Sequence, residues 1–443
     1  MHADFIIDTF RHNPEKVAVV YKSQEYTYSM LLDEFFKWLQ YMHEHDLPNN
    51  SVVTLVSDFS PASIGLILAL INKSCIIAPL SPDLKNLSRL IDIAEAEYAI
   101  YLTDDSVKME QRNIGVSNDL LISLKTGAKP GLILFSSGIT GEPKGAVHNL
   151  ALLLDKFRKP GKTLKTISFL LFDHIGGFNT LFHVLSNAGT VVVAEDRSPD
   201  GILKLIEKYK VELLPTTPTF LNMILFTRAY EKYDLSSLKI VSYGTEAMNE
   251  ATLKSFHSLF PDVILKQTYG LSEVGIMSTR SESSESLWLK VGGEGFETKI
   301  VDGKLFIKAQ SAMLGYLNAP SPFTQDGWFN TRDCVEVKGD YIKFLGRDSD
   351  IINVGGEKVY PVEIESTILE ITGVKDAAVH GEANPILGNI VVAEVSIEDC
   401  LDKKEYLLKI KKHCQLRLEK YKIPVKINFH DIIPSNHRFK KLR

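Results

Sequence analysis

Apolar and polar positions alternate between two spacings along residues 1–130. Leu31, Leu32, Phe35, Phe36 and Leu39 recur at helical spacing, which predicts a helix with one face in the core. The pair Ser60–Pro61 is typical of a helix start, because serine caps the first turn and proline fits the first helical position. The predicted order is a helix over 29–42, a strand over 52–56, a helix over 62–71 and a strand over 75–80. Alternating strands and helices predict a layered α/β fold.

The same alternation continues beyond residue 130 and then gives way to a different pattern. Strands are predicted over 131–135, 167–172, 190–194, 211–217 and 239–243, and helices over 176–186 and 199–209. Between 288 and 345 short strands are joined by glycine turns such as 301–304 and 338–340, which predicts a small β-rich, barrel-like subdomain. From 346 a compact α+β unit follows, with helices over 362–371 and 404–418 and strands over 377–380, 390–395 and 425–429. We therefore expect an N-terminal domain over 1–345 and a C-terminal domain over 346–443.

Composition and charge exclude several classes of protein. The chain has 443 residues, 44% of them hydrophobic, and a net charge of −5 without a long basic run, so nothing favours nucleic-acid binding. The four cysteines are scattered and form no CxxC pair, which argues against a disulfide framework or a zinc site and favours a reducing compartment. No signal peptide is recognised, and the most apolar stretch, 64–71, is too short to span a bilayer. We expect a cytoplasmic monomer or homodimer that is not bound to a membrane.

The stretch LFSSGITGEPKG, residues 134–145, carries the first candidate chemistry. It follows the buried strand predicted over 131–135 and packs two serines, a threonine, three glycines and Lys144 into one loop. Successive backbone N–H groups in such a turn can face an anion, and hydroxyls with a lysine add donors and charge. The loop is not a Walker P-loop, because proline precedes the lysine and glycine follows it. Taken alone it is either a phosphate-binding loop or a turn between strands.

The order of residues in this loop resembles the signature of the adenylate-forming superfamily, which contains acyl- and aryl-CoA ligases, luciferases and peptide-synthetase adenylation domains. One position departs: Ile139 stands where that family usually carries serine or threonine. The resemblance implies binding of the ATP phosphates, with Thr140 also catalytic, by Ser136, Ser137, Gly138, Thr140, Gly141 and Lys144.

Three later segments resemble the family's nucleotide-binding motifs in the right order. The resemblance implies that Gly244, Thr245 and Glu246 lie against adenine, and that the run Tyr269, Gly270, Leu271, Ser272 and Glu273 supplies an adenine-stacking ring, an α-phosphate hydroxyl and a ligand for Mg²⁺. It also implies that Asp333 accepts the ribose hydroxyls, as a two-oxygen acceptor can. Arg332 stands where the family usually has glycine.

The remaining matches concern the acyl pocket and the C-terminal domain. His174 in FDHIGGFN resembles the gate of the acyl pocket in CoA ligases, whereas its neighbour Asp173 would suit an amino-acid substrate; the spacing to NAGTVVV favours His174. Arg347 resembles the ribose-binding arginine, Ser349 falls at the hinge of a mobile C-terminal domain, and Gly355 and Gly356 would border the pantetheine tunnel. Counting from Pro434 places the catalytic lysine at Lys440, with Lys441 as the alternative and Phe439 in place of the usual glycine.

Together these resemblances imply an ATP-dependent ligase that needs Mg²⁺ and joins a small carboxylic acid to coenzyme A through an acyl-adenylate. A carrier protein bearing the same phosphopantetheine arm is an alternative acceptor. Because Ile139, Arg332 and Phe439 depart from the family pattern, a nucleotide-binding protein without catalysis is a third possibility.

Overall fold

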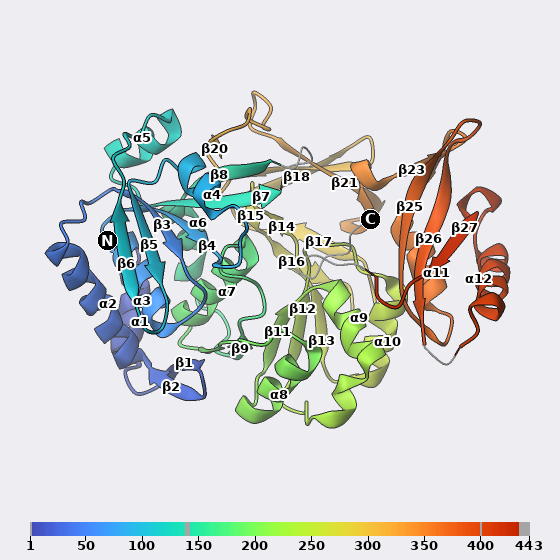
Figure 1. Ribbon diagram of the computed structural model, residues 1–443, viewed down its shortest axis with the longest axis horizontal. Coiled ribbons are helices and arrows are strands. Elements are labelled where there is room, and N and C mark those ends of the chain that lie inside the picture. The colour runs from blue at the N-terminus through green and yellow to red at the C-terminus, as the bar shows by residue number, and fades with distance from the viewer. Residues whose placement is uncertain (1, 138–141, 399–400, 434–443) are drawn as a thin grey trace. The chain divides into compact units, whose positions relative to one another are not determined.

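A computed structural model describes residues 2–137, 142–398 and 401–433, with the side chain of Ser137 left out. The chain divides into two compact units, which are described separately. The first unit holds residues 1–215, 270–276 and 308–329, and the second holds 216–269, 277–307 and 330–443. Figure 1 shows both units, with elements labelled where there is room.

The first unit is built on parallel strands with helices between them, as the alternation predicted. One sheet runs in the order β20-β8-β7-β4-β3-β5-β6, in which β7, β4, β3 and β5 are parallel. In a second sheet β1, β10 and β9 are parallel, β2 pairs antiparallel with β1, and β11 pairs with β9. Its elements are α1 Asp4–His12, β1 Val17–Tyr21, β2 Gln24–Thr27, α2 Tyr28–Glu44, β3 Val52–Val56, α3 Pro61–Asn72, β4 Ile76–Leu80, α4 Leu87–Ile93, β5 Tyr98–Leu102, β6 Val107–Gln111, α5 Asp119–Thr126, β7 Gly131–Ser137, β8 Pro143–Asn149, α6 Leu150–Asp155, β9 Lys165–Ile167, α7 Ile175–Ser186, β10 Thr190–Val192, α8 Pro199–Tyr209, β11 Leu213–Thr216, β14 Gly270–Leu271, β15 Gly275–Ile276 and β20 Gly315–Tyr316.

The second unit combines the predicted β-rich and C-terminal segments with two helices. A six-stranded sheet runs in the order β16-β17-β22-β21-β19-β18, and a five-stranded sheet is formed by β23 to β27, with α12 close by in red in Figure 1. Asp302 and Gly303, both at positive φ, make the two-residue turn between β18 and β19. The elements are α9 Pro218–Thr227, β12 Ile240–Tyr243, α10 Glu250–Leu259, β13 Ile264–Gln267, β16 Ser278–Ser281, β17 Leu289–Gly292, β18 Phe296–Val301, β19 Lys304–Ala309, β21 Phe329–Lys338, β22 Tyr341–Arg347, β23 Ile352–Val354, β24 Glu357–Val359, α11 Pro361–Leu369, β25 Val374–Asn384, β26 Gly388–Ile397, α12 Lys403–Arg417 and β27 Lys426–Phe429.

The start of α3 shows why local signals located this helix correctly. Ser60 accepts a hydrogen bond from the Ser63 N–H at 3.0 Å, and the Ser63 hydroxyl accepts one from the Ser60 N–H at 2.9 Å. This reciprocal pair satisfies two N–H groups that the first helical turn leaves without partners, and Pro61 occupies the first helical position.

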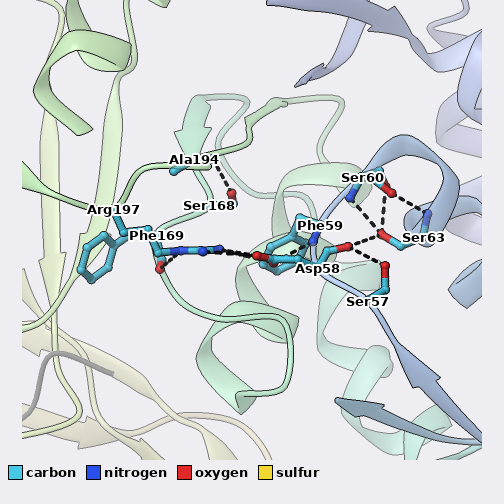
Figure 2. A network of polar contacts seen from close by, with 9 residues as sticks. All are labelled: Ser57, Asp58, Phe59, Ser60, Ser63, Ser168, Phe169, Ala194 and Arg197. Atoms are coloured by element: carbon cyan, nitrogen blue, oxygen red, sulfur yellow. Dashed lines mark hydrogen bonds and ion pairs between the residues drawn. The ribbon is translucent and has the colours of Figure 1, made fainter. Parts of the chain in front are cut away.

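The strand predicted over 167–172 is wrong beyond Ile167, where β9 ends. The apolar residues that follow, including Phe169 and Phe172, are buried. The Ser168 N–H still donates to the Val192 carbonyl at 2.9 Å, and the Phe169 carbonyl accepts from a side chain. Figure 2 shows this arrangement: the Arg197 Nε donates to the Phe169 carbonyl at 3.2 Å, and the Ser168 hydroxyl accepts from the Ala194 N–H at 3.2 Å. The apolar run therefore marks a buried connection that leads into α7.

Within the described residues, no helix combines the length and the apolar character that crossing a membrane requires. Three cysteines, Cys75, Cys334 and Cys414, are buried free thiols. Burial raises the pKa of the Cys75 thiol to about 12, so this thiol stays protonated and unreactive at neutral pH.

Candidate nucleotide-binding site

The two strands that flank the predicted phosphate loop are described up to its edges. β7 and β8 are antiparallel, with Ser136 opposite Lys144 and Ser137 opposite Pro143. Three of the predicted phosphate-binding residues, Gly138, Thr140 and Gly141, lie outside the described residues, as does Ile139. The register nevertheless places Ser136 and Lys144 directly across from each other at the root of the loop, on a ladder that continues to Asn149.

The first unit brings Lys144 and Glu273 to the same side chain. The Tyr316 hydroxyl donates a hydrogen bond to Glu273 Oε1 at 2.5 Å. The Lys144 Nζ lies 5.4 Å from the centre of the Tyr316 ring, within the range of a cation–π contact. Among the described residues no three or more His, Cys, Asp or Glu side chains form a metal-binding group. A lone carboxylate suits Mg²⁺, which takes oxygen ligands and uses few from protein when phosphates supply others.

Ser272 is held by a fully buried histidine from the strand that leaves the loop. The His148 Nε2 lies 2.6 Å from the Ser272 carbonyl oxygen, and because a carbonyl only accepts, this nitrogen must carry the proton. Burial lowers the pKa of His148 to about 4, so the ring is neutral at pH 7. The contact joins β8 to the segment that carries Ser272 and Glu273.

The second unit brings Tyr269, Asp333 and Arg347 together, three residues assigned to adenosine. The Tyr269 hydroxyl donates to Asp333 Oδ2 at 2.5 Å, and the Arg347 Nε donates to Asp333 Oδ1 at 3.3 Å. Asp333 and Arg347 face each other across the antiparallel pair β21–β22. Burial raises the pKa of the Asp333 carboxyl, although Arg347 opposes the shift, and it raises that of the Tyr269 hydroxyl well above its usual value.

One face of the Tyr269 ring is covered by Phe344, which stacks on it with a centroid distance of 4.4 Å and an angle of 18°. Gly244 lies so close to Thr268 that a Cβ at this position would meet the Thr268 hydroxyl at 2.6 Å. The Thr268 N–H and hydroxyl both donate to the Tyr243 carbonyl, at 2.7 and 3.0 Å. These bonds tie the segment before Tyr269 to the one that holds Gly244 and Thr245.

Thr245 has a φ of 74°, a left-handed conformation that β-branched residues adopt rarely and at a cost of about 1–3 kcal/mol. Its neighbour Glu246 accepts a hydrogen bond from the Thr219 N–H in the first turn of α9, at 2.8 Å. The Glu246 carboxylate therefore caps a helix N-terminus, where its charge is favourable. Glu246 therefore stabilises the start of α9, and it directly follows Thr245, the strained residue of the predicted adenine segment.

His174 stands immediately before α7 and caps it. Its Nδ1 accepts the Gly176 N–H at 3.1 Å, and its side chain is half-buried, whereas Asp173 is buried. The connection that delivers these residues is the one held by Arg197, whose guanidinium also pairs with Asp58 at 3.2–3.3 Å (Figure 2). The Arg197 guanidinium thus bonds both to the Phe169 carbonyl and to Asp58, and these bonds hold the segment that leads into α7.

The C-terminal motif residues are only partly described. Ser349 lies in the short helical turn 348–350, and its hydroxyl donates to Asp350 at 2.9 Å. Gly355 and Gly356, at φ values of 61° and 95°, make the turn between β23 and β24, which explains why both are glycine. Lys440, Lys441 and Phe439 lie outside the described residues.

Sequence reasoning missed Tyr316, His148 and Phe344. Their partners are distant along the chain: Tyr316 lies 43 residues from Glu273, and His148 lies 124 residues from Ser272. No local spacing signals such contacts.

Comparison with known proteins places these features in a family. A family profile described as AMP-binding enzyme matches residues 8–317, and one described as AMP-binding enzyme C-terminal domain matches 363–440. The chain is 27% identical over 471 residues to a 2-succinylbenzoate–CoA ligase of Bacillus pumilus, covering 96% of this chain and 93% of the relative. It is 27% identical over 336 residues to an indoleacetate–CoA ligase of Aromatoleum aromaticum, covering 69% and 64%.

The fold is also that of solved adenylate-forming enzymes. The anthranilate CoA ligase AuaEII in complex with anthranoyl-AMP aligns with a TM-score of 0.84 and 20% identity, over 98% of this chain and 95% of that one. The o-succinylbenzoate CoA synthetase of Bacillus subtilis in complex with its acyl-adenylate aligns with a TM-score of 0.76 and 20% identity, over 99% and 96%. Because a family profile matches well over half of its residues, the chain belongs to the AMP-binding enzyme family.

Proposed function

We propose that this protein is an acid–thiol ligase that uses ATP to convert a small carboxylic acid into an acyl-adenylate and then into a thioester of coenzyme A. The observation that carries the proposal is the hydrogen-bonded set of Tyr269, Asp333 and Arg347, which offers a ring face, a carboxylate and a cation to an adenosine. In the sequence Tyr269 is followed by the segment that holds Ser272 and Glu273, the residues proposed for the α-phosphate and the metal.

The chemistry explains why a nucleotide is needed. A carboxylate does not react with a thiol, because its leaving group would be oxide. When a carboxylate oxygen bonds to the α-phosphorus of ATP, the bond to pyrophosphate breaks; a thiolate then bonds to the acyl carbon and AMP leaves. Negative charge grows on phosphate oxygens in the first step, so positioned donors and cations stabilise its transition state. The residues proposed for this are Ser136, Ser137, Gly138, Thr140, Gly141, Lys144 and Lys440.

Glu273 is the proposed ligand for Mg²⁺, and its carboxylate accepts only the Tyr316 bond within the described part of the chain. When bound, Mg²⁺ would neutralise part of the triphosphate charge. The chain's own residues are proposed to bind and orient the nucleotide and the acid. Asp333 accepts the ribose hydroxyls, Tyr269 offers the face of its ring that is not covered by Phe344, and His174 lines the acyl pocket.

We further propose that the C-terminal domain begins at residue 346 and turns about Ser349 between the two steps. Gly355 and Gly356 would then approach the pantetheine arm, since a glycine turn admits a ligand close to its backbone. The 2-succinylbenzoate and indoleacetate ligases among the relatives support an aromatic or other small acid as the proposed substrate. The free, buried thiols are consistent with a cytoplasmic protein.

A pyrophosphate-release screen over aromatic, short-chain and long-chain acids, with CoA present, tests the function. The expected result is release for one class together with formation of its CoA thioester. Thioester formation only with a phosphopantetheine-loaded carrier protein would instead identify a carrier-loading enzyme. ATP binding without pyrophosphate release for any acid would show a nucleotide-binding protein that no longer catalyses.

The role of Lys440 is tested by separating the two steps. Lys440→Ala is expected to abolish adenylation, because it removes the cation for the first transition state, and to spare thioester formation from supplied acyl-adenylate. Lys441→Ala is the matched control. Equal loss of both steps in Lys440→Ala would contradict the assignment, and a selective loss of adenylation in Lys441→Ala would transfer the role to that residue.

A further inference from the structure

Residues 313–318 bridge two parts of the phosphate site in the first unit. On one side β20 pairs with β8, with Gly315 opposite Val147 and Tyr316 opposite Ala146. On the other side the Met313 N–H donates to the Glu273 carbonyl at 2.8 Å. This short segment therefore contacts both the strand that leaves the phosphate loop and the residue proposed to bind the metal.

The bridge is fastened to the exit of the loop by more than its two-residue strand. The Asn318 side chain accepts the Gly145 N–H at 3.1 Å and donates to the Pro143 carbonyl at 2.9 Å. The Leu317 N–H donates to the Gly145 carbonyl at 2.8 Å. Backbone groups on both sides of Lys144 are thus held by residues 317–318, which limits the movement of this lysine relative to the bridge.

Tyr316 is the side chain at the centre of this bridge. Its hydroxyl donates to Glu273 Oε1 at 2.5 Å, and the ammonium of Lys144 lies 5.4 Å from the centre of its ring. A phenol donates a hydrogen bond without giving up its proton at neutral pH, so it orients a carboxylate and leaves its negative charge in place. The ring face attracts the ammonium electrostatically. One side chain thus sets the separation of a negative and a positive group.

We propose that Tyr316 is a positioning residue for the metal–triphosphate part of the reaction: it holds the Glu273 carboxylate for Mg²⁺ and the Lys144 ammonium for the phosphates at a set spacing. The inference rests on the proposed function. It goes beyond the proposed function because it assigns the placement of both charged groups to a tyrosine that lies outside the motifs matched in the sequence.

Tyr316→Phe tests this in the full-length protein, because it keeps the ring and the strand pairing and removes only the hydroxyl. Binding of ATP is measured by calorimetry across a Mg²⁺ titration, a readout that needs no turnover. The concentration of Mg²⁺ that gives half of the maximal effect is expected to rise about tenfold, the size of one hydrogen bond to a charged group. ATP binding in EDTA is expected to be unchanged.

Tyr21→Phe is a matched control in the same unit. The Tyr21 hydroxyl donates to Asp104 at 2.6 Å, and Lys22 lies 5.6 Å from the centre of its ring, so it has the same kind of contacts at an exposed place. This variant is expected to leave the Mg²⁺ titration as in the wild type. Tyr316→Leu, which removes the ring as well, is expected to weaken ATP binding in EDTA too, because Lys144 loses its support.

The two half-reactions supply the second readout. In Tyr316→Phe, adenylation is expected to fall about tenfold, and thioester formation from supplied acyl-adenylate to be unchanged, because no triphosphate takes part. Combining it with Glu273→Gln should add no further loss. An unchanged Mg²⁺ titration, or equal loss of both half-reactions, would overturn the inference.

Failure of the proposed function gives a different pattern. If the wild-type protein binds ATP in a Mg²⁺-dependent manner but activates no acid, the proposed ligase function is refuted. The Mg²⁺ titration of Tyr316→Phe can still be compared with that of the wild type in this case. A wild-type protein whose ATP binding does not respond to Mg²⁺ would refute the role of Tyr316 directly.

Discussion

Replacing Asp333 by asparagine tests the adenosine site at its most buried charge. The Asp333 carboxylate already accepts bonds from Tyr269 and Arg347. An ionised carboxylate has about four acceptor positions, so two remain for the ribose hydroxyls. Asparagine keeps the size of the side chain and one acceptor oxygen, and removes the charge and the second oxygen. The variant therefore tests recognition of the ribose with little change in packing.

The magnitude follows from the number of bonds. A hydrogen bond to a charged group contributes about 1.5–3 kcal/mol, so two contribute about 3–6 kcal/mol. At about 1.4 kcal/mol per tenfold, kcat/KM for ATP should differ by about 10² to 10⁴ between ATP and 2′,3′-dideoxy-ATP in the wild type. In Asp333→Asn the kcat/KM for ATP should fall toward the kcat/KM for dideoxy-ATP, so the ratio of these two constants should approach one.

Pyrophosphate exchange at varied nucleotide concentration measures both ratios. Asp340→Asn is the control, because Asp340 lies in the turn that joins the same two strands, with its side chain 83% exposed and paired with Lys290 at 2.8 Å. Such a surface pair contributes at most about 1 kcal/mol, and this variant should retain the discrimination. If Asp333→Asn still separates ATP from dideoxy-ATP as the wild type does, Asp333 does not bind the ribose.

The raised pKa of Asp333 adds a pH dependence to the same experiment. Only the ionised carboxylate can accept both ribose hydroxyls, so ATP recognition should weaken as the pH falls through this pKa. Because burial raises it, the acid limb of kcat/KM for ATP should lie above the ordinary aspartate value of about 3.9. If Asp333→Asn still shows the same fall of kcat/KM for ATP at acidic pH, this fall reports the titration of another group.

Two further variants test the stability of the fold. Between pH 7 and pH 5 the His148 ring takes up a proton in the unfolded chain, where its pKa is about 6.5, but stays neutral in the folded one, where burial lowers the pKa to about 4. The free energy of unfolding of the wild type should therefore fall by about 2 kcal/mol over this range relative to His148→Leu, as measured by urea unfolding. Parallel pH profiles of the two proteins would refute this. Arg332→Gly should stabilise the protein by about 1 kcal/mol in the same assay, because Arg332 has a φ of 61°, whereas Lys308→Gly, in the strand β19, should destabilise it.

The left-handed backbone at Arg332 gives a physical reason for one departure from the family pattern. The family usually has glycine at this position, and glycine adopts a positive φ without steric cost. Arginine is held there while the next residue, Asp333, has its N–H bonded to the Thr331 hydroxyl at 3.0 Å. The departure therefore concerns backbone energy, and the Asp333 carboxylate keeps its place opposite Arg347.

Elements with their own start and stop signals could be predicted from the sequence. The helix α8 begins and ends where predicted, at Pro199 and Tyr209, because Ser198 caps its first turn and its apolar residues share one face. The strand predicted over 167–172 failed for a related reason. Burial alone makes a segment apolar, and whether its backbone pairs with a strand or, as at Phe169, with an arginine side chain depends on contacts across the fold.

The residues of the candidate site divide in the same way, into those with a local sequence signal and those that depend on contacts across the fold. Motif order assigned Tyr269, Glu273, Asp333 and Arg347 to the candidate site, because each lies in a short segment with a distinctive sequence. The residues that hold them could not be located in this way. Phe344 is one apolar residue of a strand, and its role appears only once β22 places it against Tyr269.

Two carboxylates assigned to ATP, Asp333 and Glu273, each accept a hydrogen bond from a neutral, partly buried tyrosine. Tyr269 donates to Asp333 and Tyr316 donates to Glu273, in both cases through a hydroxyl at 2.5 Å. A cation in place of Tyr316 would neutralise the Glu273 carboxylate and compete with the metal, whereas Asp333 accepts from Arg347 as well as from Tyr269. A phenol orients a carboxylate and preserves its charge for the ligand. We infer that the two hydroxyls orient the two carboxylates, so removing either one should weaken nucleotide binding in the presence of Mg²⁺ without unfolding the chain.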